Sequence, residues 1–220
     1  MKKGESKAVQ EAGPPIRIRA ITKDDWPLIE RLFGDRGACG GCWCMWPRLP
    51  QGGKLWEQSK GETNRRSFRR LVRARKVHAV IALAGDAPVG WCCFGPREDF
   101  PRLDRIKAIP PSPTGAWSIV CFYIQPGERQ QGLATRLAAA ATQAALAAGA
   151  KSVEGYPVES KAGAVSASFA WMGLPGVFEA NGYEELPKPA AARRLFVKSS
   201  RKPGTARSRS GLTPFPQRSS

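Results

Sequence analysis

The sequence predicts an α/β (α+β) fold in which a mixed central β-sheet is flanked by helices within a single domain. Three observations support this prediction. Apolar residues follow a two-residue period in some segments and a helical period in others. One pair of strand-like segments is separated by a short turn and so pairs antiparallel. Two other strand-like segments are followed by helices, as in parallel connections. A chain of 220 residues has room for one such domain and some additional segments.

A strand and a helix are expected near the start of the chain, after a flexible N-terminal arm of residues 1–15. Residues 16–21 alternate apolar and polar side chains, which predicts a half-buried strand. Residues 22–25 match a capping box, because Thr22 is followed three residues later by an acid. They predict a helix with Thr22 as its N-cap and with its end at Gly34.

A second helix and a β-hairpin are expected next. Asn64 is a suitable N-cap for a helix that continues to Val77. Residues 78–83 and 89–94 are two short apolar runs, and the turn-forming residues 84–88 between them predict a hairpin.

The second half of the chain contains the clearest strand and the clearest helix. Residues 117–124 are mostly β-branched and aromatic, which predicts a strand. Residues 135–148 are rich in alanine and predict a helix. A strand at residues 153–158, a helix near Phe178 and a strand pair within residues 183–197 complete the domain.

Positive charge is spread over the body of the chain as well as over its C-terminal end. Of the formal net charge of +17, residues 198–220 carry +6 and residues 1–15 carry +1, so +10 remains on residues 16–197. Such a charge fits a polyanionic ligand or partner, and it equally fits a role in solubility alone. From residue 198 onward, the composition of Ser, Arg, Pro and Gly predicts a basic disordered tail.

Neither a membrane-spanning segment nor a secretory signal is expected. No apolar run reaches the roughly 18 residues that a spanning helix needs. Residues 1–7 carry charge with no apolar stretch behind them. We therefore expect a cytoplasmic protein whose six cysteines are thiols.

The residues that join the predicted strand at 117–124 to the next helix favour anion binding. The first turn of a helix carries unpaired N–H groups and a partial positive charge. Gly132 lets the backbone approach a ligand closely, and Arg129 and Arg136 add positive charge. Taken alone, a glycine turn before a helix also fits a plain strand–helix connection.

A family resemblance supports the anion-binding interpretation. Ile124-Gln125-Pro126 followed by Arg129-x-x-Gly132-x-Ala134 resembles the pyrophosphate-binding motif of the GNAT superfamily of N-acetyltransferases. The predicted order of strands and helices is similar to that fold over residues 16–197, which would form a GNAT-like acetyltransferase domain. The segment at residues 178–183, Phe-Glu-Ala-Asn-Gly-Tyr, is similar to a late segment of the same family.

The resemblance implies that acetyl-CoA is the co-substrate and that an amine attacks its thioester directly. Backbone N–H groups would stabilise the developing oxyanion, and a base would remove a proton from the amine. The backbone near Phe122 and Ile124 would pair with the pantetheine arm. The pyrophosphate would lie against Arg129, Gln130, Gln131, Gly132, Leu133, Ala134 and Thr135.

The sequence departs from the family pattern in the groups that transfer protons. Residues 166–171 contain no tyrosine where the family often has one, and residues 117–124 contain no glutamate. The nearest polar candidates for catalysis are Glu154, Tyr156 and Glu159, although each also fits a solvated strand-edge residue. A non-catalytic acetyl-CoA-binding module of the same fold therefore remains an alternative.

Residues 39–46 form a segment rich in cysteine and tryptophan that resembles one in an uncharacterised subgroup of acetyltransferases. Its Cys-x-x-Cys-x-Cys spacing invites a zinc site, but the chain offers few further ligands, so we predict no metal. We expect a loop in which Cys42, Trp43, Met45 and Trp46 line the pocket for the acceptor, a small-molecule or peptide amine.

The helix predicted from Asn64 carries seven basic residues. They would track phosphates if the protein bound nucleic acid, but a solvated helix face is the favoured interpretation. No nucleic-acid partner is therefore expected, although a basic nucleic-acid-binding protein is the third alternative. Members of the family often form homodimers, so the resemblance also implies a homodimer. The basic residues are Arg65, Arg66, Arg69, Arg70, Arg73, Arg75 and Lys76.

Overall fold

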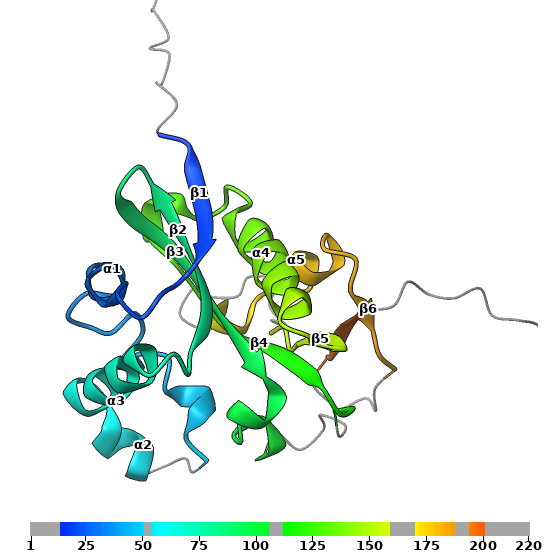
Figure 1. The fold of residues 1–220 in the computed structure, drawn as a ribbon, viewed down its shortest axis with the longest axis horizontal. Coiled ribbons are helices and arrows are strands. Elements are labelled where there is room, and N and C mark those ends of the chain that lie inside the picture. Colours follow the sequence, from blue (N-terminus) through cyan, green and yellow to red (C-terminus); the bar gives the residue numbers. More distant parts are fainter. Residues whose placement is uncertain (1–13, 51–53, 106–111, 159–169, 188–193, 201–220) are drawn as a thin grey trace, which may run out of the picture.

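A computed structural model of the chain describes residues 14–50, 54–105, 112–158, 170–187 and 194–200 (Figure 1). The strands are β1 (Ile16–Ala20), β2 (His78–Ala84), β3 (Ala87–Pro96), β4 (Ala116–Ile124), β5 (Ser152–Gly155), β6 (Glu184–Glu185) and β7 (Phe196–Ser199). The α-helices are α1 (Trp26–Phe33), α2 (Lys54–Ser59), α3 (Glu62–Arg73), α4 (Leu133–Ala147) and α5 (Pro175–Glu179). Short 3₁₀ helices are η1 (Trp46–Arg48), η2 (Arg97–Asp99), η3 (Leu103–Arg105), η4 (Pro126–Glu128) and η5 (Ala170–Met172).

All seven strands belong to one mixed sheet of order β1-β2-β3-β4-β5-β7-β6. β4 and β5 are parallel and are joined through α4, as the crossover rule requires. The neighbouring pairs β2–β3 and β3–β4 are antiparallel. The predicted α/β (α+β) fold with a mixed sheet and an antiparallel hairpin is therefore confirmed.

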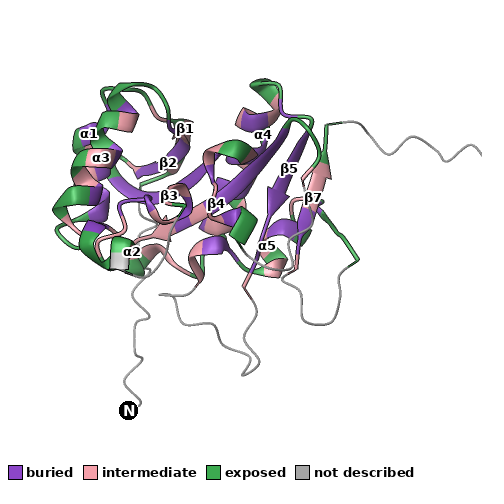
Figure 2. Cartoon of the chain, turned by 90° about the horizontal axis from the view of Figure 1, so that it is seen from below, coloured by how far each residue is buried: buried purple, intermediate pink, exposed green. Residues whose placement is uncertain are grey.

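Helices cover both faces of the sheet and enclose two apolar layers (Figure 2). One layer contains Trp91 and Cys93 of β3 together with side chains from α1 and α3. The other contains Cys92 and the apolar face of α4. Successive strand residues point to opposite faces, so these two adjacent cysteines cannot join one site.

The start of α1 differs from the sequence prediction in its cap. α1 begins at Trp26 after Asp25, and no side chain caps its first turn. The carboxylate of Asp25 instead accepts two hydrogen bonds from Arg19, each 2.7 Å long, and one of 2.6 Å from the N–H of Thr22. The predicted N-cap at Thr22 is therefore wrong, because this ion pair orders the turn, while the predicted end at Gly34 is confirmed.

The second predicted helix is α3, and Asn64 is not its N-cap. α3 begins at Glu62 after Gly61, whose φ of 75° is in the left-handed region. Asn64 is buried inside the helix and its side chain donates to the carbonyl of Gly41 over 3.1 Å. The buried amide thus ties α3 to the cysteine-rich loop, and the helix ends at Arg73 rather than at Val77.

The sheet extends slightly beyond the predicted end of the domain. β7 continues to Ser199, where it pairs with Ser152 of β5. Residues 1–13 and 201–220, which include most of the predicted arm and tail, lie outside the described residues. Within the described ranges, no helix is both long and apolar enough to cross a membrane.

Gly155 at the end of β5 should be intolerant of any side chain. A Cβ atom placed there would lie 2.1 Å from the ring of Phe178, which is fully buried. We expect Gly155→Ala to lower the free energy of unfolding by roughly 1–3 kcal/mol, as overpacking does. The comparison is with Gly176→Ala, where a Cβ would meet no atom within 4 Å. Equal midpoints of urea unfolding for the two variants would contradict the prediction.

Candidate functional site

β4 and β5 separate halfway along β4 and leave one edge of β4 open. The last pair in their parallel register is Ile119 with Gly155, yet β4 continues to Ile124. Beyond β5 the chain bonds elsewhere, since the N–H of Val158 donates to the carbonyl of Gly173 over 3.0 Å. Among the described residues, this stretch of β4 has no strand partner on that side. Its backbone groups can therefore pair with an extended ligand.

A β-bulge lies on β4 at the point where the two strands separate. Cys93 of β3 pairs with Cys121, whereas the next residue, Phe94, pairs with Ile119, so Val120 is the additional residue. A bulge disrupts the regular ladder and increases the local twist. It can therefore turn a peptide N–H away from β3 and toward a ligand. No local pattern in the sequence predicts this bulge, because it depends on the register between β3 and β4.

The turn predicted to bind an anion follows directly at the end of β4. Gln130 and Gly132 both have left-handed φ angles, of 61° and 72°. α4 begins at Leu133, two residues earlier than predicted, and its first bond runs from the N–H of Arg136 to the carbonyl of Gly132. A Cβ at Gly132 would meet no atom within 4 Å, so the space in front of the helix start is open. The preceding N–H groups are thus available to an anion.

The basic side chains of the turn brace it against the sheet. The Nε of Arg129 donates to the carbonyl of Ile124 over 3.0 Å, and Nη2 of Arg136 donates to the carbonyl of Ile16 over 2.7 Å. Their positive charges nevertheless remain beside the helix start. The structure therefore gathers the predicted pyrophosphate residues 129–135 on one turn and the first turn of α4.

Phe122 and Ile124 lie on the unpaired length of β4, as an extended ligand would require. Their side chains face the layer formed with α4 and α5, where the ring of Phe122 packs against that of Phe178 with centroids 6.3 Å apart. Only their backbone is therefore available at the open edge.

Two of the predicted catalytic residues meet in a buried hydrogen-bond network. Oε2 of Glu154 accepts hydrogen bonds from Ser112 over 2.7 Å and from Tyr156 over 2.5 Å. The Nε of Arg97 lies 3.9 Å from the same oxygen, and the Tyr156 hydroxyl is 2.9 Å from that of Ser118. Glu154 is only 1% exposed and Tyr156 is fully buried. Their interpretation as solvated strand-edge residues is therefore wrong.

The electrostatics of this network favour positioning over proton donation. Burial and the adjacent Glu154 carboxylate raise the pKa of Tyr156 well above its ordinary value. Such a phenol is a poor acid toward a leaving thiolate, whose ordinary pKa is about 8.5. The third candidate, Glu159, lies outside the described residues.

The cysteine-rich loop contributes more to the core than to an open pocket. Trp43 is 2% exposed, and its ring centroid lies 5.7 Å from those of both Trp26 and Phe33. Met45 is buried in the same layer. Packing in this layer encloses most of both side chains, and their predicted place in the acceptor pocket stays a prediction. Trp46 remains partly exposed.

Trp46 belongs to a partly exposed aromatic cluster, which we call the tryptophan cluster. Its ring centroid is 4.8 Å from that of Trp56 in α2 and 6.4 Å from that of Trp171 in η5. The guanidinium carbon of Arg102 lies 3.2 Å from the centre of the Trp46 ring. The cysteine-rich segment alone does not predict this cluster, because Trp56 belongs to the next helix and Trp171 is more than 100 residues away in sequence.

The thiols of the loop lie in apolar surroundings. The indole N–H of Trp91 contacts the sulfur of Cys44 over 3.1 Å, and burial raises the pKa of Cys44 well above its usual value. Burial also raises the pKa of Cys42 to about 11, so both are neutral thiols at pH 7. Over the described residues, no group of three or more Cys, His, Asp or Glu side chains is arranged to hold a metal ion.

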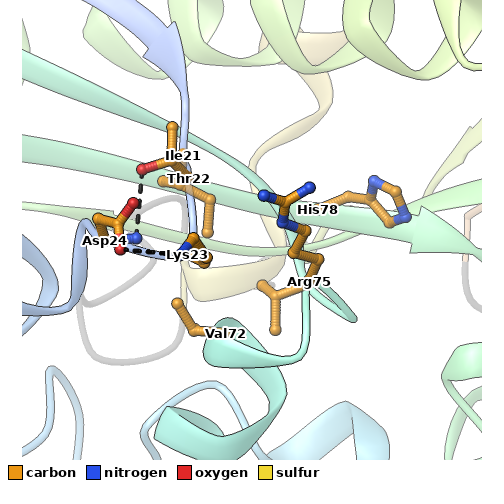
Figure 3. A pocket seen from close by; sticks show the side chains of 8 residues that line it. Ile21, Thr22, Lys23, Asp24, Val72, Arg75 and His78 are labelled. Atoms are coloured by element: carbon orange, nitrogen blue, oxygen red, sulfur yellow. Dashed lines mark hydrogen bonds and ion pairs between the residues drawn. The ribbon is translucent and has the colours of Figure 1, made fainter.

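A separate hollow of about 540 Å³ lies between the β1–α1 connection and the start of β2 (Figure 3). His78 reaches it from β2, and its ring lies 4.7 Å from that of Trp117 at the beginning of β4. The hollow is thus at the opposite end of β4 from Gly132. It is lined by Ile21, Thr22, Lys23, Asp24, Val72, Arg75, Val77 and His78.

Comparisons with known proteins agree with this geometry. Residues 43–165 match the sequence profile of the family described as "Acetyltransferase (GNAT) family". No curated protein sequence matches the chain.

Among solved structures, an N-acetyltransferase from Staphylococcus aureus Mu50 has a similar fold, with a TM-score of 0.50 and 12% identity over 84% of this chain and 98% of that one. A PaiA N-acetyltransferase from Thermoplasma acidophilum, solved with coenzyme A, gives a TM-score of 0.46 and 14% identity over 84% and 99%. An aminoglycoside N-acetyltransferase, solved with CoA, gives a TM-score of 0.48 and 18% identity over 82% of this chain and 95% of that one.

The buried network should contribute measurably to stability. We expect Tyr156→Phe to lower the free energy of unfolding by roughly 1–3 kcal/mol, because it removes a buried donor to Glu154. Ser152→Ala is the matched control, since its buried hydroxyl has no hydrogen-bond partner among the described residues. Denaturant unfolding should show a loss for the first variant and none for the second. An unchanged free energy of unfolding in Tyr156→Phe would contradict a stabilising role for the network.

Proposed function

Because the chain belongs to the GNAT acetyltransferase family, we propose that it is an N-acetyltransferase that transfers the acetyl group of acetyl-CoA to an amine. One observation carries the proposal. The unpaired edge of β4 is followed, after η4 and a short turn, by the open helix start at Gly132. An extended chain that ends in a pyrophosphate matches this combination of backbone edge and helix N-terminus.

The turn would hold the pyrophosphate. Its N–H groups precede α4, no side-chain hydrogen bond caps the helix start, and Arg129 and Arg136 add positive charge beside them. The small side chain of Ala134 and the absence of one at Gly132 leave the approach to these groups open. The pantetheine arm would follow the backbone of β4 past Ile124 and Phe122.

The bulge at Val120 would mark the reacting end of the path. Acetyl-CoA supplies a thioester whose carbon the amine attacks directly, so that the C–N bond forms and the C–S bond breaks. A peptide N–H that the bulge turns toward the thioester would stabilise the oxyanion. The amine must also lose a proton, because its ordinary pKa is about 10. Glu154 and Tyr156 would hold β4 and β5 at their point of separation rather than transfer this proton themselves.

The tryptophan cluster would form one wall of the acceptor site. Trp171 packs against the same core layer as Cys121 and Tyr123 of β4, so the cluster begins beside the open strand edge. Partly exposed aromatic rings bind flat or cationic amines well. The acceptor would therefore be a small-molecule or peptide amine that contacts Trp46.

A non-catalytic acetyl-CoA-binding module is a second candidate. The burial of Glu154 and the raised pKa of Tyr156 favour it, because neither group is a free base or a good acid. Release of free CoA in the presence of a library of amines distinguishes the two candidates. Tight binding of acetyl-CoA without any such release would establish the module.

Gly132→Glu should abolish acetyl-CoA binding, because it places bulk and negative charge in front of α4. We expect the dissociation constant to rise at least 100-fold by calorimetry. Gly149→Glu is a matched control at the other end of the same helix, since Gly149 also has a left-handed φ, of 96°, with open space around it. An unchanged acetyl-CoA affinity in Gly132→Glu, or an equal loss of affinity in both variants, would contradict a pyrophosphate site at this turn.

Trp46→Ala should impair use of the amine without affecting acetyl-CoA. We expect kcat/KM for the best amine of the library to fall about tenfold, which corresponds to about 1.4 kcal/mol. The dissociation constant for acetyl-CoA should stay within twofold. Leu55→Ala, which alters an exposed side chain beside Trp56, should leave both quantities unchanged. A wild-type kcat/KM for Trp46→Ala would exclude the tryptophan cluster from the acceptor site.

A further inference from the structure

The outer face of α3 carries four exposed arginines, Arg66, Arg69, Arg70 and Arg73, which we call the arginine face. They are spaced three or four residues apart, so they are neighbours on the helix surface. Together with Thr63 and Ser67 they enclose a shallow hollow of about 370 Å³. Within the part of the chain that the structure describes, no acidic side chain lines this hollow.

The single acid of α3 neutralises at most one of the four arginines. Glu62 pairs with Arg65 over 3.1 Å and with Arg66 over 3.5 Å. Among the described residues, no ion pair joins Arg69, Arg70 or Arg73 to a carboxylate, although Arg69 interacts electrostatically with Glu30 of α1. Like charges at these spacings repel one another and destabilise the helix. An anion bound in the hollow would relieve the repulsion.

The residue type favours phosphate as the anion. All four members are arginine, whose planar guanidinium donates two parallel hydrogen bonds to a phosphate. The aromatic rings nearby lie beneath the charges, with Arg69 over Trp26 and Arg65 over Trp43, each at 5.7 Å. Both rings are buried and are not available to stack on a base. Contacts at this face would thus be to the backbone of a nucleic acid and independent of its sequence.

Positive charge continues past the end of α3 into the hollow of Figure 3. Arg75 has a left-handed φ of 56°, and its guanidinium extends over the hollow toward His78 (Figure 3). Lys23 reaches the same hollow from the β1–α1 connection, where it forms an ion pair with Asp24 over 3.7 Å, so the added positive charge comes from Arg75. The basic surface is therefore long enough to contact more than one phosphate group, as binding of a nucleic acid requires.

We propose that the arginine face binds nucleic acid through its phosphate groups without regard to base sequence. This function goes beyond acetyl transfer, because α3 is separate from β4 and from the turn at Gly132. It also revises the expectation of an ordinary solvated helix face. Spacing alone predicts exposure, whereas the structure adds an acid-free hollow and a continuation toward Arg75.

The test measures binding of a fluorescein-labelled, mixed-sequence 20-nucleotide RNA to the full-length protein by fluorescence anisotropy. We expect Arg70→Gln/Arg73→Gln to weaken binding at least tenfold at 100 mM salt. The slope of log affinity against log salt should also become shallower by about 1.4, since each lost contact to a single strand removes about 0.7. A second RNA of scrambled sequence should bind equally.

The matched control is Arg17→Gln/Lys151→Gln, which removes the same charge from exposed sites away from α3. It should weaken binding less than twofold. Equal weakening by both pairs would show that net charge alone attracts the RNA and would overturn the proposal. So would an absence of RNA binding at 50 mM salt, or equally tight binding of a labelled polyglutamate peptide.

Thermal unfolding separates loss of binding from loss of fold. Relief of repulsion should leave the Tm of Arg70→Gln/Arg73→Gln equal to or above that of the wild type at low salt. Arg66→Gln/Arg69→Gln repeats the test on the other half of the face. If neither pair weakens RNA binding while both remain folded, the proposal is wrong.

Discussion

The separation of β4 from β5 is the constraint on which the rest of the site depends. A strand inside a sheet satisfies its backbone groups with its neighbours, so an open edge exists only where a neighbour turns away. Here β5 leaves after Gly155, where the ring of Phe178 occupies the space that a side chain would need. The bulge at Val120 directly follows Ile119, the last residue of β4 that pairs with β5. Backbone geometry, rather than a set of polar side chains, would thus create the proposed surface for the co-substrate.

The two faces of the sheet have different chemistry because the pleat sends alternate side chains to opposite sides. Toward α4 and α5, Phe122 and Phe178 form an apolar support beneath the open edge. Toward α1 and α3, Ser118 and Glu154 meet in the buried network, and Trp171 begins the aromatic wall. The acetyl donor and the acceptor would therefore meet at β4. The donor would lie over the layer that faces α4 and α5, and the acceptor would contact the layer that faces α1 and α3.

Local sequence patterns predicted those features whose causes are local. Alternation identified β1, two apolar runs around a turn identified β2 and β3, and a β-branched and aromatic run identified β4. Glycine chemistry identified the turn at Gly132. Prediction failed where a distant residue decided the outcome. Asn64 bonds to Gly41 instead of capping α3, and Arg19 occupies the carboxylate of Asp25. Each competing partner lies elsewhere in the chain and becomes adjacent only after folding.

By itself, the sequence determined the class of fold, the glycine turn before α4 and the concentration of arginine on one helix, because periodicity, backbone freedom and charge are properties of neighbouring residues. Tertiary structure alone decided the bulge at Val120, the burial of Glu154 and the meeting of Trp46 with Trp171. The tertiary structure also decided that, among the described residues, no acidic side chain lines the hollow in the arginine face. These features depend on strand register and on contacts between distant segments, which packing of the whole domain selects.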